Sequence, residues 1–127
     1  MTPGEVVRAY TDAWISGDLF AVLDLYHDDL VLHYGGANAF TGDHVGKDAA
    51  IATLLAVQER TQREPIAVLD VMESAKNATA WVRERWIVDG APRELDRILV
   101  YRVADDRLVE CRLFDFDQAL VDRVLAS

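Results

Sequence analysis

Apolar residues in the first half of the chain recur at helical spacing. Over Pro3–Trp14 they fall three or four positions apart and so share one helical face, and Gly17 follows as a stop signal. A shorter helix is expected over Asp18–Tyr26, with Asp18 as its cap. A short strand over Val31–Tyr34, a loop, and a third helix over Lys47–Gln62 come next. The positions of this third helix expected to face inward are Ile51, Leu54 and Leu55.

After Pro65 the pattern changes to the alternation of apolar and polar residues that is typical of strands. Turn-forming residues such as Asp89-Gly90 separate four runs rich in β-forming residues. These runs are Ile66–Ser74, Thr79–Val88, Arg93–Ala104 and Leu108–Asp115. A last helical turn begins at Asp117. Helices followed by a meander of strands predict an α+β domain, with helices packed on one face of a bent antiparallel sheet.

Each of the last three strands has an apolar face that holds a single ionisable residue, namely Glu84, Arg97 or Asp115. If a four-residue loop joins the second and third long strands, Glu84 lies opposite Arg97. If a three-residue loop precedes the fourth strand, Arg97 lies opposite Asp115, and the three residues form a row. The row is either a structural ion-pair ladder or a polar centre in a dry cavity, where a carboxyl pKa is shifted and supplies an acid or a base.

The composition argues against several classes of partner. The chain has 127 residues and a formal charge of −9, which fits one domain and argues against nucleic acid or an anionic membrane surface as a partner. No apolar stretch is long enough for a membrane span. The first residues lack the pattern of a secretory signal, so a cytoplasmic location is expected. A small hydrophobic molecule meets none of these objections.

The sequence also predicts chemistry that needs neither a cofactor nor a metal. The glycines between positions 35 and 46 lack the lysine ending of a phosphate loop, and the chain has no nucleotide fingerprint. The three histidines show no close ligand spacing. Cys111 is the only cysteine, so neither an intrachain disulfide nor a cysteine metal cluster is expected.

Five segments together resemble the nuclear transport factor 2-like superfamily, which includes ketosteroid isomerase and the SnoaL-like polyketide cyclases. These segments are Val6–Tyr10, Ser16–Leu19, Leu25–Asp29, Gly42–Ala49 and Leu113–Asp115. The stretch from His33 to Gly46 is most similar to the SnoaL-like branch. The resemblance implies one SnoaL-like domain over residues 1–127, in which a cone-shaped, strongly curved antiparallel sheet wraps around the N-terminal helices and encloses a pocket. It also implies a homodimer formed through the outer face of the sheet, with which Trp81, Ile98 and Val100 are compatible.

The resemblance carries over to individual residues only in part. Tyr10 matches the oxyanion-hole tyrosine of ketosteroid isomerase, whereas Tyr34 stands where that enzyme has its catalytic aspartate. Leu99 replaces the second oxyanion-hole acid, so steroid isomerisation by that mechanism is not expected. Asp115 matches, by position, the acid–base aspartate of the polyketide cyclases.

The leading hypothesis is a cofactor-free acid–base enzyme of the cyclase, isomerase or dehydratase type, acting on a hydrophobic carbonyl or polyketide-like compound. In this hypothesis Asp115 moves the proton, and His33 is the competing base. Tyr10 or Arg97 stabilises the oxyanion, and Glu84 holds Arg97 in place. Further ligand contacts are expected from Trp14, Tyr34, Phe40, His44, Trp86, Leu99, Tyr101 and Leu113.

Each of these roles has a structural alternative. Asp115 can be the N-cap of the last helix, Tyr10 a core tyrosine with a satisfied hydroxyl, and His33 a surface residue at a strand end. The rival function is a non-catalytic ligand-binding or dimerisation module of the same fold, which predicts that Glu84, Arg97 and Asp115 are fully paired with one another. A cofactor-independent oxygenase on this fold is a third alternative.

Overall fold

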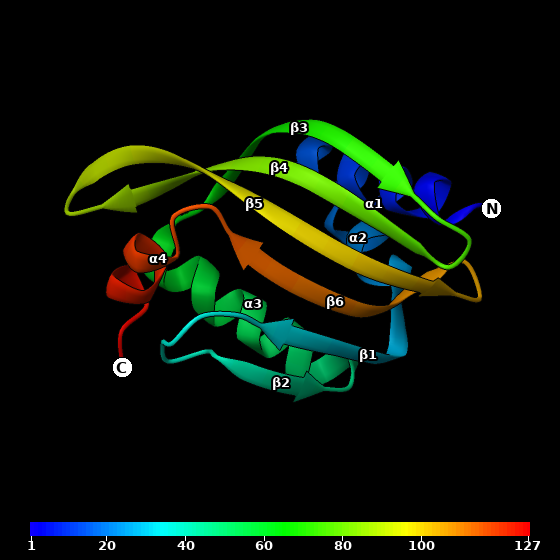
Figure 1. The fold of residues 1–127 in the computed structure, drawn as a ribbon, viewed down its shortest axis with the longest axis horizontal. Helices are drawn as coiled ribbons and strands as arrows, with labels where there is room; N and C mark the ends of the chain where they lie inside the picture. The colour runs from blue at the N-terminus through cyan, green and yellow to red at the C-terminus, as the bar shows by residue number, and fades with distance from the viewer.

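The computed structural model describes residues 1–127 and has four helices and one six-stranded sheet (Figure 1). The helices are α1 (Pro3–Ser16), α2 (Leu19–Leu25), α3 (Lys47–Thr61) and α4 (Gln118–Val124). The strands are β1 (Tyr26–Tyr34), β2 (Gly42–Val45), β3 (Glu64–Glu73), β4 (Asn77–Val88), β5 (Ala91–Ala104) and β6 (Arg107–Asp115). The α+β class predicted from the sequence is therefore confirmed.

Local signals explain where α1 begins and ends. The Thr2 hydroxyl accepts a hydrogen bond from the Glu5 amide, and the Glu5 carboxylate accepts one from the Thr2 amide, which forms a capping box. Gly17 ends the helix in the left-handed conformation, with a φ of 77°. Because these signals are local, the sequence predicts the first helix well.

Two elements in the first half of the chain differ from the sequence prediction. Tyr26 begins β1 instead of ending α2, because it pairs with Leu108 of β6 and buries its ring in the core. The segment predicted as a loop contains the short strand β2, which pairs with the end of β1. Most of β2 is exposed to solvent, so no alternation of apolar and polar residues marks it in the sequence.

The order of strands in the sheet is β2-β1-β6-β5-β4-β3. All neighbouring strands are antiparallel except β1 and β6, which run parallel. The sheet is therefore mixed, and the prediction of a wholly antiparallel sheet is wrong. A parallel neighbour cannot be joined by a hairpin, and here the connection between β1 and β6 holds α3 and four strands of the same sheet.

The predicted register between β4 and β5 is wrong by two residues. Asp89 and Gly90 both have positive φ, at 53° and 80°, and form a tight two-residue hairpin turn. Val88 therefore pairs with Ala91, which places Val82, and not Glu84, directly opposite Arg97. Glu84 remains a diagonal neighbour of Arg97 because both side chains point to the same face.

The predicted pairing of Arg97 with Asp115 is confirmed, although the turn before β6 is shorter than expected. Ala104 pairs with Arg107 at the turn, and an irregularity between Arg102 and Val103 restores the expected register further along the strands.

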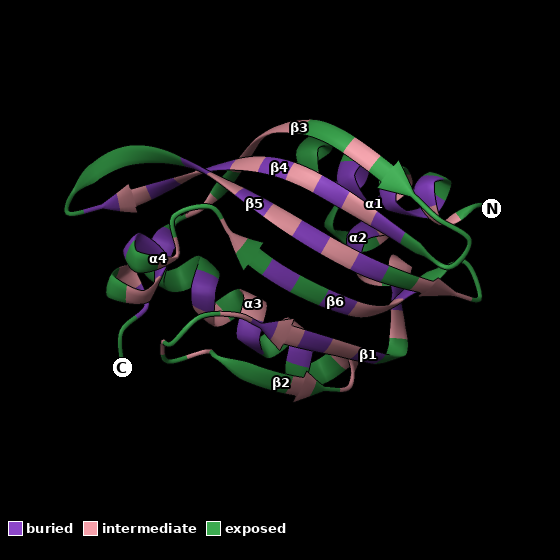
Figure 2. Cartoon of the chain, in the orientation of Figure 1, coloured by how far each residue is buried: buried purple, intermediate pink, exposed green.

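The core lies between the sheet and the helices α1 and α3, which pack against the same face of the sheet (Figure 1). Figure 2 shows buried positions alternating with less buried ones along β4 and β5, as the predicted faces require. In α3 the buried apolar residues are Ala50 and Val57, whereas Leu55 is 61% exposed, so the prediction that Leu55 faces the core is wrong. None of the four helices has both the length and the apolar character needed to cross a lipid bilayer.

Candidate functional site

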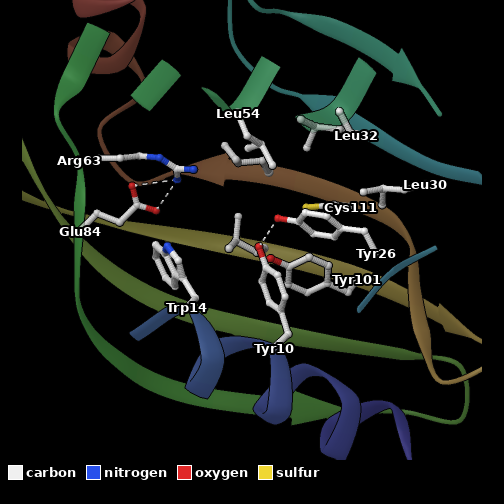
Figure 3. A pocket seen from close by; sticks show the side chains of 13 residues that line it. Tyr10, Trp14, Tyr26, Leu30, Leu32, Leu54, Arg63, Glu84, Tyr101 and Cys111 are labelled. Carbon is white, nitrogen blue, oxygen red and sulfur yellow. Dashed lines mark hydrogen bonds and ion pairs between the residues drawn. The ribbon is translucent and has the colours of Figure 1, made fainter. Parts of the chain in front are cut away.

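Three tyrosines from different elements meet at one end of the candidate site (Figure 3). Tyr10 of α1, Tyr26 of β1 and Tyr101 of β5 are all more than nine-tenths buried. The hydroxyl oxygens of Tyr10 and Tyr26 are 2.7 Å apart and share a hydrogen bond, and the Tyr101 ring meets the Tyr10 ring edge to face. Burial raises the pKa of all three phenols, so each is protonated at neutral pH and can donate a hydrogen bond.

Cys111 lies beside this tyrosine cluster on β6. Burial raises the pKa of its thiol to about 12, so the group is neutral and poorly nucleophilic at physiological pH. The polar groups at this end of the site are therefore neutral donors, and none of them is a base.

The other end of the site is built around Glu84, which is completely buried on β4. Its Oε1 accepts a hydrogen bond of 2.9 Å from the indole of Trp86. Arg63 Nη1 lies 3.5 and 3.4 Å from Oε1 and Oε2, which makes a loose ion pair. Burial alone raises the pKa of Glu84, but the charges of Arg63 and Arg97 outweigh this effect and lower it, so the carboxylate is ionised.

Arg63 reaches this position because α3 ends directly before it. Gln62 stops the helix in the left-handed conformation, with a φ of 49°, and the Gln58 amide donates a hydrogen bond to the Arg63 carbonyl oxygen. The chain then enters β3 at Glu64, next to β4, which carries Glu84.

Asp115 is closed off by Arg97. Arg97 Nε donates to Asp115 Oδ1 at 2.6 Å and Nη2 donates to Oδ2 at 3.2 Å, which is a two-pronged contact, and Nη2 also donates to the Tyr34 hydroxyl at 2.8 Å. The side chains of Arg97 and Asp115 are 0% and 1% exposed. Burial raises the pKa of Asp115, although Arg97 opposes the shift. The N-cap of α4 is Asp117, which accepts from the Leu120 amide, so Asp115 does not cap that helix.

The tyrosine cluster and Glu84 line an inner cavity of about 40 Å³, whose walls are otherwise mostly apolar. Figure 3 shows Arg63 and Glu84 on one side of this cavity and the three phenols on the other. A larger outer compartment of about 380 Å³ lies among α1, α2 and α3. The two compartments adjoin, since five residues line both. These residues are Tyr10, Trp14, Tyr26, Leu54 and Arg63.

Because of their sizes, the two compartments differ in what they can hold. The inner cavity has room for a few water molecules or one small functional group, since a single water needs roughly 10–15 Å³. The outer compartment falls within the range of roughly 300–1,000 Å³ that is usual for small-molecule sites.

Residues 7–111 match the family model of the SnoaL-like domain. The chain belongs to the SnoaL-like domain family. No protein of curated function matches its sequence.

Several solved structures share the fold of this chain. A protein of unknown function with a cystatin-like fold from Xanthomonas campestris is 22% identical, with 100% of each chain covered and a TM-score of 0.91. An NTF2-like protein of unknown function from Burkholderia pseudomallei is 22% identical, with 100% of each chain covered and a TM-score of 0.82. IdmH from Streptomyces antibioticus, described as a candidate polyketide cyclase, is 18% identical over 95% of this chain and 96% of its own, with a TM-score of 0.74. At these identities the likeness shows the NTF2-like fold alone.

In this SnoaL-like domain the residues predicted as catalytic lie in three different places. Tyr10 and Glu84 line the inner cavity. Arg97 and Asp115 lie beside Glu84 in the ion-pair network but line neither compartment. His33 is on the opposite face of the sheet, where Nδ1 is 2.6 Å from Asp43 and Nε2 is 2.7 Å from Glu110. The strand alternation places Leu32 and Tyr34 inward and therefore His33 outward, so His33 is not a base in the cavity.

The predicted ligand contacts divide in the same way. Those that line the cavity are Trp14, Leu99, Tyr101 and Leu113. Trp86 is fully buried beneath Arg97, and Tyr34 is buried against the same guanidinium. Phe40 packs on Tyr34, and His44 donates a hydrogen bond to the Phe40 carbonyl oxygen. These four residues line neither compartment.

Two residues of the SnoaL-like site were not expected from the sequence. The spacing predicts that Tyr26 lies in a helix, and Arg63 stands between a helix and a strand, where no periodicity marks its direction. The only signal for Arg63 was physical, since a buried carboxylate such as Glu84 needs a cation nearby.

Proposed function

We propose that this SnoaL-like domain binds a small, largely apolar carbonyl compound and catalyses a proton transfer on it without a cofactor. The two adjoining compartments are the ligand pocket, around which the sheet curves as a cone. Cyclisation, isomerisation and dehydration of a polyketide-like compound all begin with such a proton transfer. Likeness in fold to a candidate polyketide cyclase is consistent with this substrate class.

The observation that carries the proposal is an ionised carboxylate buried in an apolar cavity opposite three protonated phenols. Glu84 accepts the proton from a carbon next to the ligand carbonyl, so the C–H bond breaks and an O–H bond forms. The electron pair moves onto the carbonyl oxygen, which becomes an enolate oxygen. A hydrogen bond from Tyr10 or Tyr26 stabilises the negative charge that develops there. Return of the proton to another atom of the ligand completes an isomerisation or sets up ring closure.

The proposal assigns the base to Glu84 and not to Asp115. Both oxygens of Asp115 accept hydrogen bonds from Arg97, and the carboxylate has no surface on either compartment. The ion pairs of Glu84 are looser, at 3.4–3.6 Å to two guanidinium groups, and its one short hydrogen bond, 2.9 Å from the Trp86 indole, ends on Oε1. Glu84 also lines the inner cavity.

Exchange of carbon-bound hydrogen for deuterium tests this function without knowledge of the natural substrate. Bicyclic ketones such as tetralone and indanone are incubated with the protein in deuterated buffer, and NMR follows the loss of the protons next to the carbonyl. We expect Glu84→Gln to lower the catalysed exchange by about 10²–10⁴-fold, since a general base contributes that much. The matched control is Glu94→Gln, which changes an exposed glutamate on β5 and should leave the rate unchanged.

A rate in Glu84→Gln equal to that of the unaltered protein would contradict the assignment of the base. The second candidate function, a ligand-binding module without catalysis, is favoured by one observation, the closed Arg97–Asp115 pair. That function predicts that the ketones bind, as seen by quenching of tryptophan fluorescence, while no exchange is catalysed.

A further inference from the structure

Arg63 has an unused hydrogen-bonding edge. Both hydrogen bonds of its side chain come from Nη1 and end on Glu84. Nε is buried and has no acceptor within the protein. A guanidinium presents Nε and Nη2 as a planar two-pronged fork that matches the two oxygens of a carboxylate. In Arg63 this fork is therefore free.

Arg97, in the same network, shows what such a fork binds here. Its Nε and Nη2 donate to the two oxygens of Asp115 at 2.6 and 3.2 Å. The two arginines thus share Glu84 as an ionic neighbour, but only Arg97 has a second carboxylate on its fork. The protein supplies no equivalent of Asp115 for Arg63.

The position of Arg63 shows where a partner would come from. Arg63 is one of the residues that line both compartments, and Figure 3 shows its guanidinium at the edge of the inner cavity, above Glu84. A buried donor without an acceptor destabilises the folded state, so the unpaired Nε favours an occupant that brings an acceptor.

We propose that Arg63 binds the carboxylate group of the ligand, so that the natural ligand is an apolar monocarboxylic acid whose hydrophobic part fills the outer compartment. This inference deepens the proposed function, because it rests on the two compartments being the ligand pocket. It names Arg63 as the residue that selects acidic ligands.

The surroundings limit the ligand to a single negative charge. Arg63 and Glu84 are the only ionisable residues that line the two compartments apart from the protonated phenols and thiol. The chain as a whole carries a formal charge of −9. A doubly charged phosphate would bury a charge that one guanidinium, already shared with Glu84, cannot balance. A carboxylate reaches the fork through a rotation of the Arg63 side chain, which the loose contact of 3.4–3.5 Å to Glu84 permits.

Two probes of nearly the same shape test the inference. Naphthoate carries a carboxylate and naphthamide a neutral amide, and isothermal titration calorimetry near neutral pH gives the affinity of each. We expect the unaltered protein to bind naphthoate at least about tenfold more tightly, since charge-assisted two-pronged hydrogen bonds are the strong ones. Arg63→Met should remove this preference while naphthamide binding changes little. Arg63→Lys, which keeps the charge but not the fork, should retain part of it.

Arg85→Met is the matched control, because Arg85 is an exposed arginine on β4 that lines neither compartment. It should leave the preference for naphthoate unchanged. The inference is overturned if the unaltered protein binds the two probes equally or binds neither, or if folded Arg63→Met keeps the preference. Should Arg63→Met fail to fold, an unchanged preference in Arg63→Lys overturns it instead.

The outcome is separable from that of the proposed function. Glu84→Gln removes the base but leaves the Arg63 fork in place, so this variant should still prefer naphthoate. If the unaltered protein prefers naphthoate but catalyses no deuterium exchange, the proposed function fails and the inference stands. If it catalyses the exchange but shows no preference for naphthoate, the inference fails and the function stands.

Discussion

Two buried carboxylates flank Arg97, and their pKa values move in opposite directions. Glu84 has two guanidinium neighbours, which overcome the effect of burial and lower its pKa. Asp115 has one, and burial prevails, so its pKa is raised. Arg97 is therefore the residue on which both buried charges depend, although it touches neither compartment.

Replacing Arg97 with methionine should lower the free energy of unfolding by about 3–5 kcal/mol, because it leaves two buried carboxylates without this cation. The loss should be smaller at roughly pH 4 than at neutral pH. A carboxyl group whose pKa is raised in the folded state destabilises the protein once the pH rises above the pKa that the group has in the unfolded chain. Urea denaturation at both pH values measures this. Arg102→Met, on the same strand but half exposed, should cost less than about 1 kcal/mol. A loss in Arg97→Met no larger than in this control would show that the network is dispensable.

At the scale of single residues the sequence predicts the faces of helices and strands better than the partners in the ion-pair network. Tyr10 and Trp14 were placed on one helical face by their spacing, and Glu84 on the inner strand face by alternation. The sequence does not predict the role of Arg63, because this residue lies between the end of α3 and the start of β3. Neither the helical nor the strand spacing of apolar residues extends across that junction. The role of Arg63 depends on a partner far away in the sequence, which no local pattern encodes.

At the scale of elements, His33 connects neighbouring strands on the outer face of the sheet. This residue of β1 contacts Asp43 of β2 and Glu110 of β6, so one side chain links three neighbouring strands. Burial and the positive charge of Arg112 lower the pKa of His33, but the two carboxylates outweigh both and raise it. The imidazolium form is therefore stabilised in the folded state.

This linkage predicts a pH-dependent contribution to stability. Because the folded pKa of His33 is raised, its contribution is complete below roughly pH 6.5 and is lost as pH rises through the folded pKa. We expect His33→Gln to lower the free energy of unfolding by about 1 kcal/mol near pH 6 and by clearly less at alkaline pH. Asp43→Asn, which removes one of the two carboxylates, should show a weaker dependence. The prediction would be contradicted if the free energy of unfolding depended on pH in the same way in His33→Gln and in the unaltered protein.

The faces of the strands could be predicted from the sequence, whereas the strand partners could not. Alternation is local, so Glu84, Arg97 and Asp115 were placed on one face correctly. Register depends on turns, and the tight turn at Asp89-Gly90 moved β4 by two residues relative to β5. The irregularity in β5 after Arg102 compensated for the other turn, so Arg97 met Asp115 although the assumed loop length was wrong.

At the scale of the whole molecule, the sheet face away from the helices carries an apolar strip. Trp81, Ile98 and Phe114 are direct neighbours across β4, β5 and β6. Phe116 stacks on Trp81, and Phe114 and Phe116 are 53% and 61% exposed. Ion pairs such as Arg83–Asp96 border this strip with polar groups. An apolar centre with a polar rim is typical of a protein interface.

We therefore predict that two copies of the chain associate through this strip to form a homodimer. Native mass spectrometry should show the dimer for the unaltered protein and a folded monomer for Phe114→Asp. Phe20→Asp is the control, because Phe20 is 86% exposed on α2 and does not belong to the strip, and it should remain dimeric. A monomer for the unaltered protein, or a dimer in Phe114→Asp, would assign the strip another role.

The parallel pairing of β1 with β6 also determines when the sheet can close. β6 is the last strand along the chain, yet it lies between β1 and β5 and joins the β1–β2 hairpin to the rest of the sheet. During synthesis the first two strands emerge well before their partner, and contacts between residues so distant in sequence form slowly. In a nascent chain that ends before Arg107 the sheet therefore consists of two separate parts, which only the helices connect, and the sheet closes when β6 arrives.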